Sequence, residues 1–452
     1  MNKLAKISGI ICTAALMTNI FAGCGTKEAP ASPQGTTKAA EQKTAAPKPV
    51  SLRFSWWGGE TRHKATLDAI SLYKQKFSHV TIEAEYQGYD GYEQKLKTQL
   101  AGGSAPDLMQ VDQPWLPELT SRADTMFLDL YKNSNMELKG FDSTFLKNFC
   151  EYGGKLAGVP MGINGKTLII NKAAADKMGI DLSKPFDWDR LLEEAKKLRA
   201  KDNKFYLMNA DLGVASGMLK SYLKQKTGDT LFKDDYTIAV SKADMVTGFT
   251  WIKNAFDSGV YQSLGESQLF TGKTEQNPKW INQETIMIED WSSGVGKYKG
   301  TLPKDTAVDV VLPPVMKDAK SGAAMVRPSM VMSVNSKASS IDEAVKFTSW
   351  LMNDKEAALV LGDQRAVPAT ETARKAITEA NKLDKEVAKA VELASKSQAK
   401  PDNALSTNSQ LDEILKDIVQ KVTFNKATPE QAADELIKRC TDKLKELKDA
   451  KK

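Results

Sequence analysis

Tryptophan and a carboxylate recur together at three places along the chain, each at the end of a predicted strand. The three pairs are Trp57 with Glu60, Asp112 with Trp115, and Asp290 with Trp291. An indole offers a flat apolar face on which the C–H face of a sugar ring packs, and a carboxylate accepts hydrogen bonds from neighbouring hydroxyl groups. A lone tryptophan is more often a core residue. The repetition therefore favours a carbohydrate site over three unrelated core residues.

Trp56 and Trp57 run together and are followed by Gly58 and Gly59. Because successive side chains of a strand point to opposite faces, one indole must face the core and the other must face away from it. We predict that Trp56 is the core residue and that Trp57 faces a binding cleft. The two glycines carry no side chain, so they would leave the Trp57 ring uncovered and let a ligand approach the backbone.

Alternation and helical spacing predict how these pairs are positioned. The pattern begins with strand, helix, strand, helix and strand, over residues 51–57, 62–77, 80–86, 92–100 and 106–112. This order with short connections predicts a parallel sheet covered by helices. Ligands bind such sheets beyond the carboxyl ends of the strands, so residues 57–63 and 112–115 should lie on one rim.

The rest of the chain continues with both kinds of segment. Residues 155–172 predict two short strands that cross between lobes, further strands are expected at 285–291, 308–314 and 330–335, and helix dominates after Asp342. The body of roughly 400 residues is too large for one hydrophobic core. We therefore predict an α/β protein with two lobes.

The N-terminal segment predicts where the protein works. Two lysines precede a short apolar run, and small residues lead into Cys24, which predicts a secretory signal peptide over residues 1–23. The exit F-A-G-C resembles a bacterial lipobox, whose cysteine carries lipid, although Phe21 stands where that pattern prefers leucine; the alternative is an ordinary secreted protein. Residues 24–49 contain no aromatic or branched aliphatic side chain, so they predict a disordered tether.

Composition argues against several functional classes. The chain has 63 Lys and Arg against 57 Asp and Glu, a formal net charge of +6, with both signs interspersed; a nucleic-acid-binding surface would need clustered basic residues. We expect no metal and no cofactor, because no Cys/His cluster has metal-ligand spacing and no P-loop, G-x-S-x-G or H-E-x-x-H motif occurs. Cys150 and Cys440 could pair across the fold or remain free thiols.

Several blocks of sequence, taken in their order and spacing, resemble extracellular solute-binding proteins of carbohydrate ABC importers. The blocks are W-W-G-G at 56–59, L-A-G-G-S-A-P-D-L-M-Q-V-D at 100–112, Y-G-G-K-L-A-G-V-P at 152–160, L-I-I-N-K at 168–172, I-M-I-E-D-W-S-S-G at 286–294 and R-A-V-P-A at 365–369. The resemblance covers essentially everything after Val50.

The resemblance implies a two-lobed fold of the periplasmic-binding-protein type, in which each lobe is a sheet flanked by helices. Lobe I would hold residues 50–162 and 308–355, and lobe II would hold residues 163–307 and 356–452. A hinge of crossover strands near 162–164, 307 and 355 would let the lobes close around a ligand.

The resemblance also implies a set of ligand contacts. Matched onto the family's pattern, contacts fall on Glu60, Asp112, Asn164 and Trp291, with Asn209 and Asp211 near a further contact loop. Trp57, Trp115 and Asp290 join them as members of the aromatic and acidic pairs. Further donors at the rim would be Arg62, His63, Arg327 and Arg365, which would favour a uronic-acid-bearing sugar, or else form ordinary salt bridges. Asn164 stands where a maltodextrin-binding relative has a carboxylate, and no tryptophan lies near 411–415, which disfavours maltodextrin.

The function that the resemblance implies is a non-catalytic receptor. It would capture an oligosaccharide and deliver it to the transmembrane subunits of an ABC permease, as a monomer held on the outer face of the cell membrane by lipid on Cys24. One alternative is a receptor for another solute, such as a peptide or a phosphate ester. The other is a glycoside hydrolase that draws a carboxylate pair from Glu60, Asp112, Glu289 and Asp290, although no pair is evidently fixed at the required separation.

Overall fold

The computed structural model describes residues 47–120 and 126–450. The compact unit in this range is Lys48–Lys452. The predicted signal peptide at 1–23, the predicted lipid site Cys24 and nearly all of the predicted tether at 24–49 lie outside the described residues.

Strands of this unit form one large mixed sheet, and a separate hairpin of two short strands accompanies it. The strands are β1 Val50–Trp57, β2 Val80–Gln87, β3 Leu108–Val111, β4 Glu151–Tyr152, β5 Lys155–Leu156, β6 Val159–Asn171, β7 Tyr206–Asn209, β8 Thr285–Trp291, β9 Val308–Val311, β10 Val326–Val334 and β11 Val367–Pro368. The order across the sheet is β2-β1-β3-β10-β6-β8-β7, with β9 and β11 also paired to β6. The pairs β1–β2, β1–β3 and β7–β8 are parallel, whereas β10 and β8 run antiparallel to β6.

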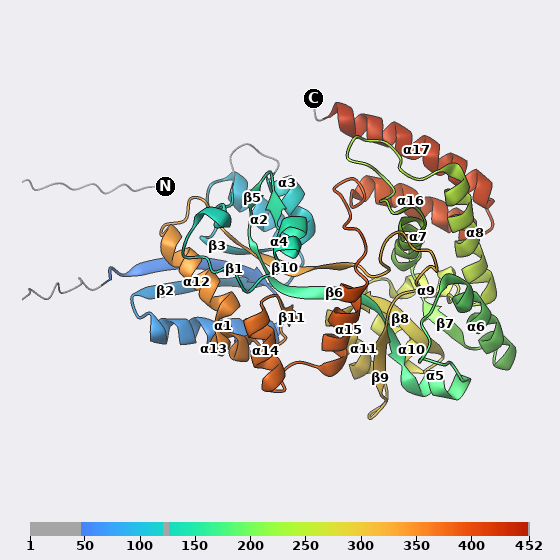
Figure 1. Ribbon diagram of the computed structural model, residues 1–452, viewed down its shortest axis with the longest axis horizontal. Helices are drawn as coiled ribbons and strands as arrows, with labels where there is room; N and C mark the ends of the chain where they lie inside the picture. The colour runs from blue at the N-terminus through green and yellow to red at the C-terminus, as the bar shows by residue number, and fades with distance from the viewer. Residues whose placement is uncertain (1–46, 121–125, 451–452) are drawn as a thin grey trace, which may run out of the picture. The chain divides into compact units, whose positions relative to one another are not determined.

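Helices cover this sheet on the N-terminal and C-terminal halves alike (Figure 1). They are α1 Glu60–Lys76, α2 Tyr92–Ala101, α3 Leu116–Thr120, α4 Ser143–Phe149, α5 Lys172–Met178, α6 Trp188–Lys201, α7 Leu212–Thr227, α8 Lys242–Ser258, α9 Leu264–Ser267, α10 Pro278–Ile281, α11 Val295–Thr301, α12 Ile341–Asn353, α13 Lys355–Leu361, α14 Glu371–Glu379, α15 Lys385–Lys396, α16 Ser409–Thr423 and α17 Pro429–Asp449.

The first lobe is built around β1, β2, β3 and the near ends of β6 and β10. Its core includes Phe54, Leu108, Val159, Val331 and Phe347, all buried. Helix α1 follows β1 after only two glycines, which fixes the strand-to-helix turn at the rim. Helix α13 packs on α1, so a segment from far along the chain completes this lobe (Figure 1).

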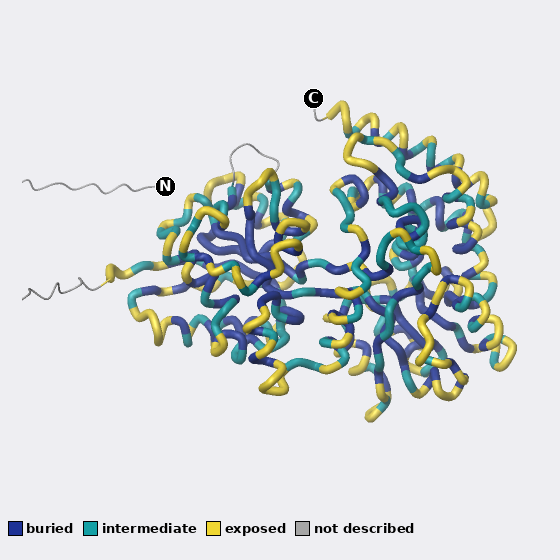
Figure 2. Tube along the Cα trace, viewed as in Figure 1, coloured by how far each residue is buried: buried dark blue, intermediate teal, exposed yellow. Residues whose placement is uncertain are grey.

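The second lobe is built around the far half of β6 with β7 and β8. Its main core contains Leu168 and Ile170 of β6 together with Met208 and Met287, and helices α7, α8, α16 and α17 pack around it. Helix α15 covers another face through Val391, which packs with Ile169 of β6. In Figure 2 the inner strands are largely buried, as β3 is in the first lobe and β8 in the second, whereas β2 at the edge of the sheet is partly exposed.

Strand β6 joins the two lobes, because its first residues enter one core and its last residues enter the other. It is one continuous strand of 13 residues preceded by the short β5, rather than the two strands predicted at 155–172. Strand β7 at Tyr206–Asn209 was missed by the sequence analysis. It has only four residues, too few for alternation to be read.

Contacts also bear on where each lobe begins and ends. Strand β9 pairs with residues 168–171 of β6, and α13 and α14 pack with the first lobe through α1 and α12. We therefore propose that residues 308–311 belong to lobe II and residues 355–379 to lobe I, in place of the predicted boundaries at 307 and 355. The connecting segments would then be the middle of β6, residues 312–325 and residues 380–384.

Candidate functional site

Four aromatic side chains gather where β1, β2 and β3 end. This rim cluster consists of Trp57, Tyr89, Tyr92 and Trp115. The Trp57 ring centroid lies 5.2 Å from that of Tyr92 and 5.4 Å from that of Trp115, and the Tyr89 ring stacks on Trp115 at 6.0 Å. The Tyr92 hydroxyl donates to the carbonyl oxygens of Ser55 and Gln110, which ties the cluster to two parallel strands.

The two adjacent tryptophans do face opposite ways, as strand alternation requires. Trp56 is fully buried, stacks on Tyr86 and donates from Nε1 to Nδ1 of His63, in agreement with the prediction that it is a core residue. Trp57 lies in the rim cluster but is only 7% exposed. The prediction that Trp57 is left uncovered is therefore wrong, because Tyr89, Tyr92 and Trp115 enclose its ring.

Asp112 stands beside the rim cluster at the end of β3. Its Oδ2 accepts a hydrogen bond of 3.2 Å from the Tyr89 hydroxyl, and its Oδ1 lies 3.9 Å from Nη1 of Arg327 on β10. Burial raises the pKa of the Asp112 carboxyl, and the charge of Arg327 partly opposes that rise. Oδ1 is buried and has no hydrogen-bond partner in the part of the chain that the structure describes.

Arg327 connects this rim to the second lobe. Its guanidinium lies over the Trp291 ring, 4.7 Å from the ring centroid, and Trp291 is the last residue of β8. The Nε of Arg327 is buried and, among the described residues, has no hydrogen-bond partner. Two neighbouring side chains thus each have a buried polar atom without a hydrogen-bond partner among the described residues. These atoms are the acceptor Oδ1 of Asp112 and the donor Nε of Arg327.

A cavity of about 460 Å³ opens at this place between the two lobes. From the first lobe it is lined by Gln113, Pro114, Pro117, Thr120, Asn148, Phe149, Tyr152 and Gly153. Met325, at the end of the connecting segment 312–325, also lines the cavity, as do Val326 and Arg327 at the start of β10. The second lobe supplies Lys224, Trp291, residues 399–404 and Thr407. We call it the Trp291 cavity; its volume suits a small ligand such as an oligosaccharide of a few rings.

Three of the predicted contacts close to this cavity are held by other parts of the fold. The Asn164 amide donates to Ser293 Oγ and accepts from Ser292 Oγ and from the Ser293 backbone N–H. Arg62 donates to the carbonyl oxygens of Gln364 and Trp57. His63 is buried and accepts from Trp56. These contacts favour structural roles, because each side chain already has its hydrogen-bond partners.

Most of the remaining residues predicted to bind ligand are likewise hydrogen-bonded to other parts of the protein. Asp211 is the N-cap of α7 and accepts from Val214 N–H, while Asn209 is buried and bonded to Asn277. Asp290 accepts from the Tyr298 hydroxyl at 2.6 Å. Arg365 is 3% exposed inside the first lobe, where it donates to Gln110 and Thr66. Glu60 is exposed in the first turn of α1, and no hydrogen bond or ion pair among the described residues links it to the rim cluster.

For Arg365 the prediction of a rim donor is corrected, since the side chain is sealed in the core and burial lowers its pKa. The structure also adds residues that the sequence analysis did not select. Tyr89 and Tyr92 belong to the segment G-Y-D-G-Y after β2, and the strand-end rule applied to the second strand would have found them. Lys224 and Asp402 line the Trp291 cavity and bond to each other; their separation in sequence gives no signal.

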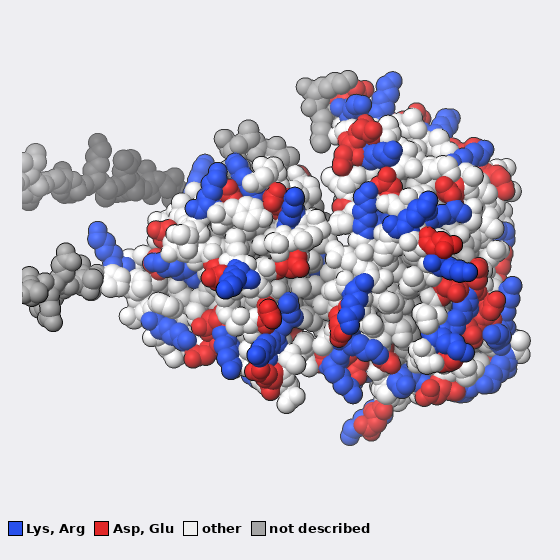
Figure 3. Space-filling view, in the orientation of Figure 1, with Lys and Arg blue, Asp and Glu red and all other residues white. Residues whose placement is uncertain are grey.

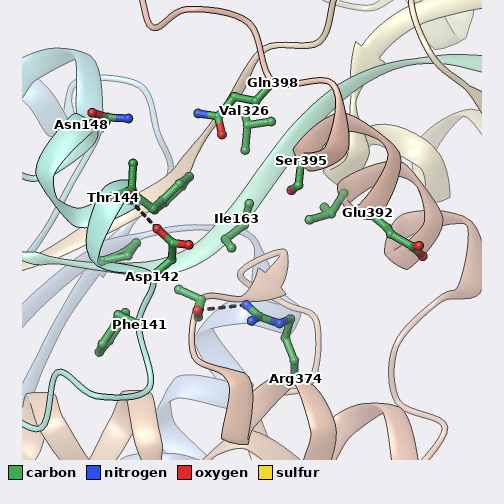
Figure 4. A pocket seen from close by; sticks show the side chains of 14 residues that line it. Phe141, Asp142, Thr144, Asn148, Ile163, Val326, Arg374, Glu392, Ser395 and Gln398 are labelled. Atoms are coloured by element: carbon green, nitrogen blue, oxygen red, sulfur yellow. Dashed lines mark hydrogen bonds between the residues drawn. The ribbon is translucent and has the colours of Figure 1, made fainter. Parts of the chain in front are cut away.

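A second cavity, of about 630 Å³, adjoins the first (Figure 4). It lies between α4, the connecting strands and the α14–α15 region, and shares Asn148 and Val326 with the Trp291 cavity. Its strongest polar groups are already engaged, because Asp142 caps α4 and Arg374 donates to the carbonyl oxygens of Pro368 and Ala369. Unlike the Trp291 cavity, it contains no buried polar atom that lacks a partner among the described residues.

In residues 47–120 and 126–450 no group of His, Cys, Asp and Glu side chains is arranged to hold a metal ion. None of the helices in those ranges has both the length and the apolar content needed to cross a bilayer. On the face drawn in Figure 3, basic and acidic side chains are interspersed. Cys150 and Cys440 are both buried free thiols.

Comparisons with known proteins place these features in a family context. The model of a family described as bacterial extracellular solute-binding protein matches residues 68–395. A periplasmic solute-binding protein of Pectobacterium atrosepticum superposes with a TM-score of 0.80 at 27% identity, over 88% of this chain and 99% of that one. An oligogalacturonide-binding protein of Yersinia enterocolitica, solved with saturated digalacturonic acid, superposes with a TM-score of 0.74 at 26% identity, over the same shares of the two chains. A protein of Brucella abortus is 26% identical over 185 residues, which is 40% of this chain and 44% of that relative.

Proposed function

The chain belongs to the bacterial extracellular solute-binding proteins, and from this premise we propose that it captures an oligosaccharide in the Trp291 cavity and delivers it to an ABC permease. The observation that carries the proposal is the cavity itself, which has Trp291 and Arg327 in its wall and Asp112 at its edge. We further propose that lipid on Cys24 holds the receptor at the outer face of the cell membrane, where it works as a monomer.

The unsatisfied atoms explain how a sugar would be held. The 3.9 Å between Asp112 Oδ1 and Arg327 Nη1 is too long for a hydrogen bond. A sugar hydroxyl in that position would donate to the carboxylate and accept from the guanidinium, since a hydroxyl can do both. An apolar ligand would leave both groups unpaired at a cost of about 1–3 kcal/mol each. The site therefore favours a ligand rich in hydroxyl groups.

Aromatic rings supply the apolar part of the recognition. The Trp291 ring has Arg327 near one face and lines the cavity, and Tyr152 and Phe149 line it from the first lobe. Sugar rings have C–H faces that pack on such surfaces. In this proposal the rim cluster has a supporting role: it fixes Tyr89, and thereby the orientation of the Asp112 carboxylate.

The connecting strands provide the means of closure. Because the cavity takes lining residues from both lobes, a ligand that contacts both stabilises the arrangement in which they approach. The pairing of β10 with β6 is irregular between Pro328 and Val331. Such irregularities weaken the ladder locally, so this region is where we expect the lobes to rotate.

The rival reading as a glycoside hydrolase is less well supported. Glu289 is paired with Lys166 at 2.8 Å, Asp290 is bonded to Tyr298, and Asp112 is bonded to Tyr89. Glu289 and Asp290 are thus engaged at β8 in the second lobe and Asp112 at the rim of the first, whereas a glycosidase needs two carboxylates that flank one bond. The family and the two structures named above are binding proteins, which also favours a receptor.

Calorimetric titration with a panel of oligosaccharides, dipeptides and sugar phosphates tests the proposal directly. We expect one oligosaccharide class to bind at micromolar concentration or below, and to be recovered intact after prolonged incubation. Release of reducing ends would favour the hydrolase. Binding of only a peptide or a phosphate ester would favour the receptor for another solute.

A further inference from the structure

Arg327 is the one cationic residue in the wall of the Trp291 cavity whose donors are incompletely used within the described residues. Its Nε is buried without a partner, and its nearest carboxylate is 3.9 Å away. An arginine that only balanced the charge of Asp112 would be expected to form a direct hydrogen bond, which is typically 2.7–2.9 Å long for such pairs. The guanidinium carbon lies instead over the Trp291 ring, 4.7 Å from the ring centroid.

The other cations in the wall are already paired. Lys224 donates to Asp402 at 2.6 Å and to the carbonyl oxygen of Lys400 at 2.8 Å. Lys400 in turn is paired with Asp229. Among the described residues that line the cavity, Asp402 is the one carboxylate, and Lys224 engages it. Within the part of the chain that the structure describes, the unbalanced positive group that a ligand would meet in this cavity is therefore Arg327.

We propose that the sugar captured here carries a carboxylate, as a uronic acid does, and that Arg327 binds that carboxylate. The inference rests on the proposed function and names its substrate class. A guanidinium presents its N–H groups in one plane and at the spacing of two carboxylate oxygens. Contact with the Trp291 ring restricts the positions that this guanidinium can take before a ligand arrives.

Asp112 would complete the recognition through a hydroxyl group. A ligand carboxylate close to an ionised Asp112 would be repelled, unless a hydroxyl or a proton lies between them. A ligand hydroxyl at Oδ1 would donate to Asp112, and the Tyr89 hydroxyl already stabilises the charge on Oδ2 by donating to it. A uronic acid supplies both groups, because its carboxylate is bonded to a ring carbon next to a hydroxyl-bearing or linked carbon.

The test compares two disaccharides that differ only at C6 of each ring, digalacturonate with a carboxylate there and the matching galactobiose with a neutral hydroxymethyl group, by calorimetric titration of the mature protein. We expect digalacturonate to bind on the order of tenfold to a hundredfold more tightly than galactobiose, the range for a hydrogen-bonded charge. Arg327→Met should remove this preference, and Arg327→Lys should restore only part of it, since lysine keeps the charge but not the planar fork. Arg374→Met, at the second cavity, is the matched control and should leave both affinities unchanged.

Each outcome decides a different point. If galactobiose binds as tightly as digalacturonate, the carboxylate inference is overturned while the oligosaccharide receptor stands. If Arg327→Met weakens both disaccharides equally, Arg327 only supports Trp291 and the inference is also overturned. If neither disaccharide nor any other oligosaccharide binds, the proposed function fails and the inference fails with it.

Discussion

Replacing Trp57 by alanine should destabilise the first lobe rather than simply empty a sugar platform. The ring is 7% exposed and lies within 5.6 Å, centroid to centroid, of Tyr89, Tyr92 and Trp115. Truncating a buried tryptophan costs about 3–5 kcal/mol, because transfer free energy is lost and a cavity remains. In a lobe of this size that loss corresponds to a fall in melting temperature of roughly 10 °C.

Scanning calorimetry and urea unfolding without ligand measure this effect. Trp57→Phe is the control, since it keeps a ring in the cluster and should recover much of the loss. The same cluster orients Tyr89, which donates to Asp112, so ligand affinity of Trp57→Ala should fall as well. A variant that melts within about 2 °C of the parent and yet binds sugar poorly would refute this reasoning. It would show that Trp57 is an uncovered platform after all.

Three further predictions rest on the same site, and a fourth rests on the N-terminal segment. Trp291→Ala should weaken sugar binding by tens-fold, about 2 kcal/mol or more, with little change in melting temperature because the ring is only half-buried; parent-like calorimetric affinity would contradict the aromatic cavity. Cys24→Ala should move the protein from the membrane fraction to the soluble fraction, since a lipid anchor needs that thiol; immunoblots of the two fractions decide. Saturating ligand should reduce the radius of gyration measured by small-angle X-ray scattering, and an unchanged profile would argue against closure. Burial raises the pKa of Asp112, so its charged form opposes folding above that pKa; Asp112→Asn should therefore raise the melting temperature at pH 7, less so toward pH 4, while lowering sugar affinity.

The elements that position the site could be predicted because their signals are local. The alternation of V-S-L-R-F-S-W-W and V-T-I-E-A-E-Y fixed two strands almost to their observed ends. The strand-end rule then placed Asp112 and Trp115 at one rim with Trp57. Each of these inferences uses only the period of a strand and the direction of a parallel sheet.

The roles of individual polar side chains could be predicted less well, because a polar residue at a strand end has competing uses. Asp211 directly precedes helix α7, and its carboxylate caps the N-terminus of that helix. A position just before a helix favours this role independently of any ligand. Arg365 shows the opposite case, because its burial depends on packing against Gln110 and Thr66. Those residues lie far away in sequence, so no local pattern could reveal that the guanidinium is enclosed.

The pair that best defines the candidate site, Asp112 and Arg327, is also brought together from positions far apart in the sequence. Asp112 and Arg327 meet only because β10 returns to lie against β3 in the sheet, and the sequence predicted both residues without predicting their distance. That distance carries the functional argument. A direct hydrogen bond would have made the pair a structural salt bridge, whereas at the observed 3.9 Å the buried Oδ1 and Nε have no partner among the described residues and could each still bond to a ligand group. Because leaving both atoms unpaired opposes folding, a ligand that satisfies them would recover that free energy on binding. Stability in the absence of sugar and affinity for sugar should therefore trade against each other at these two positions.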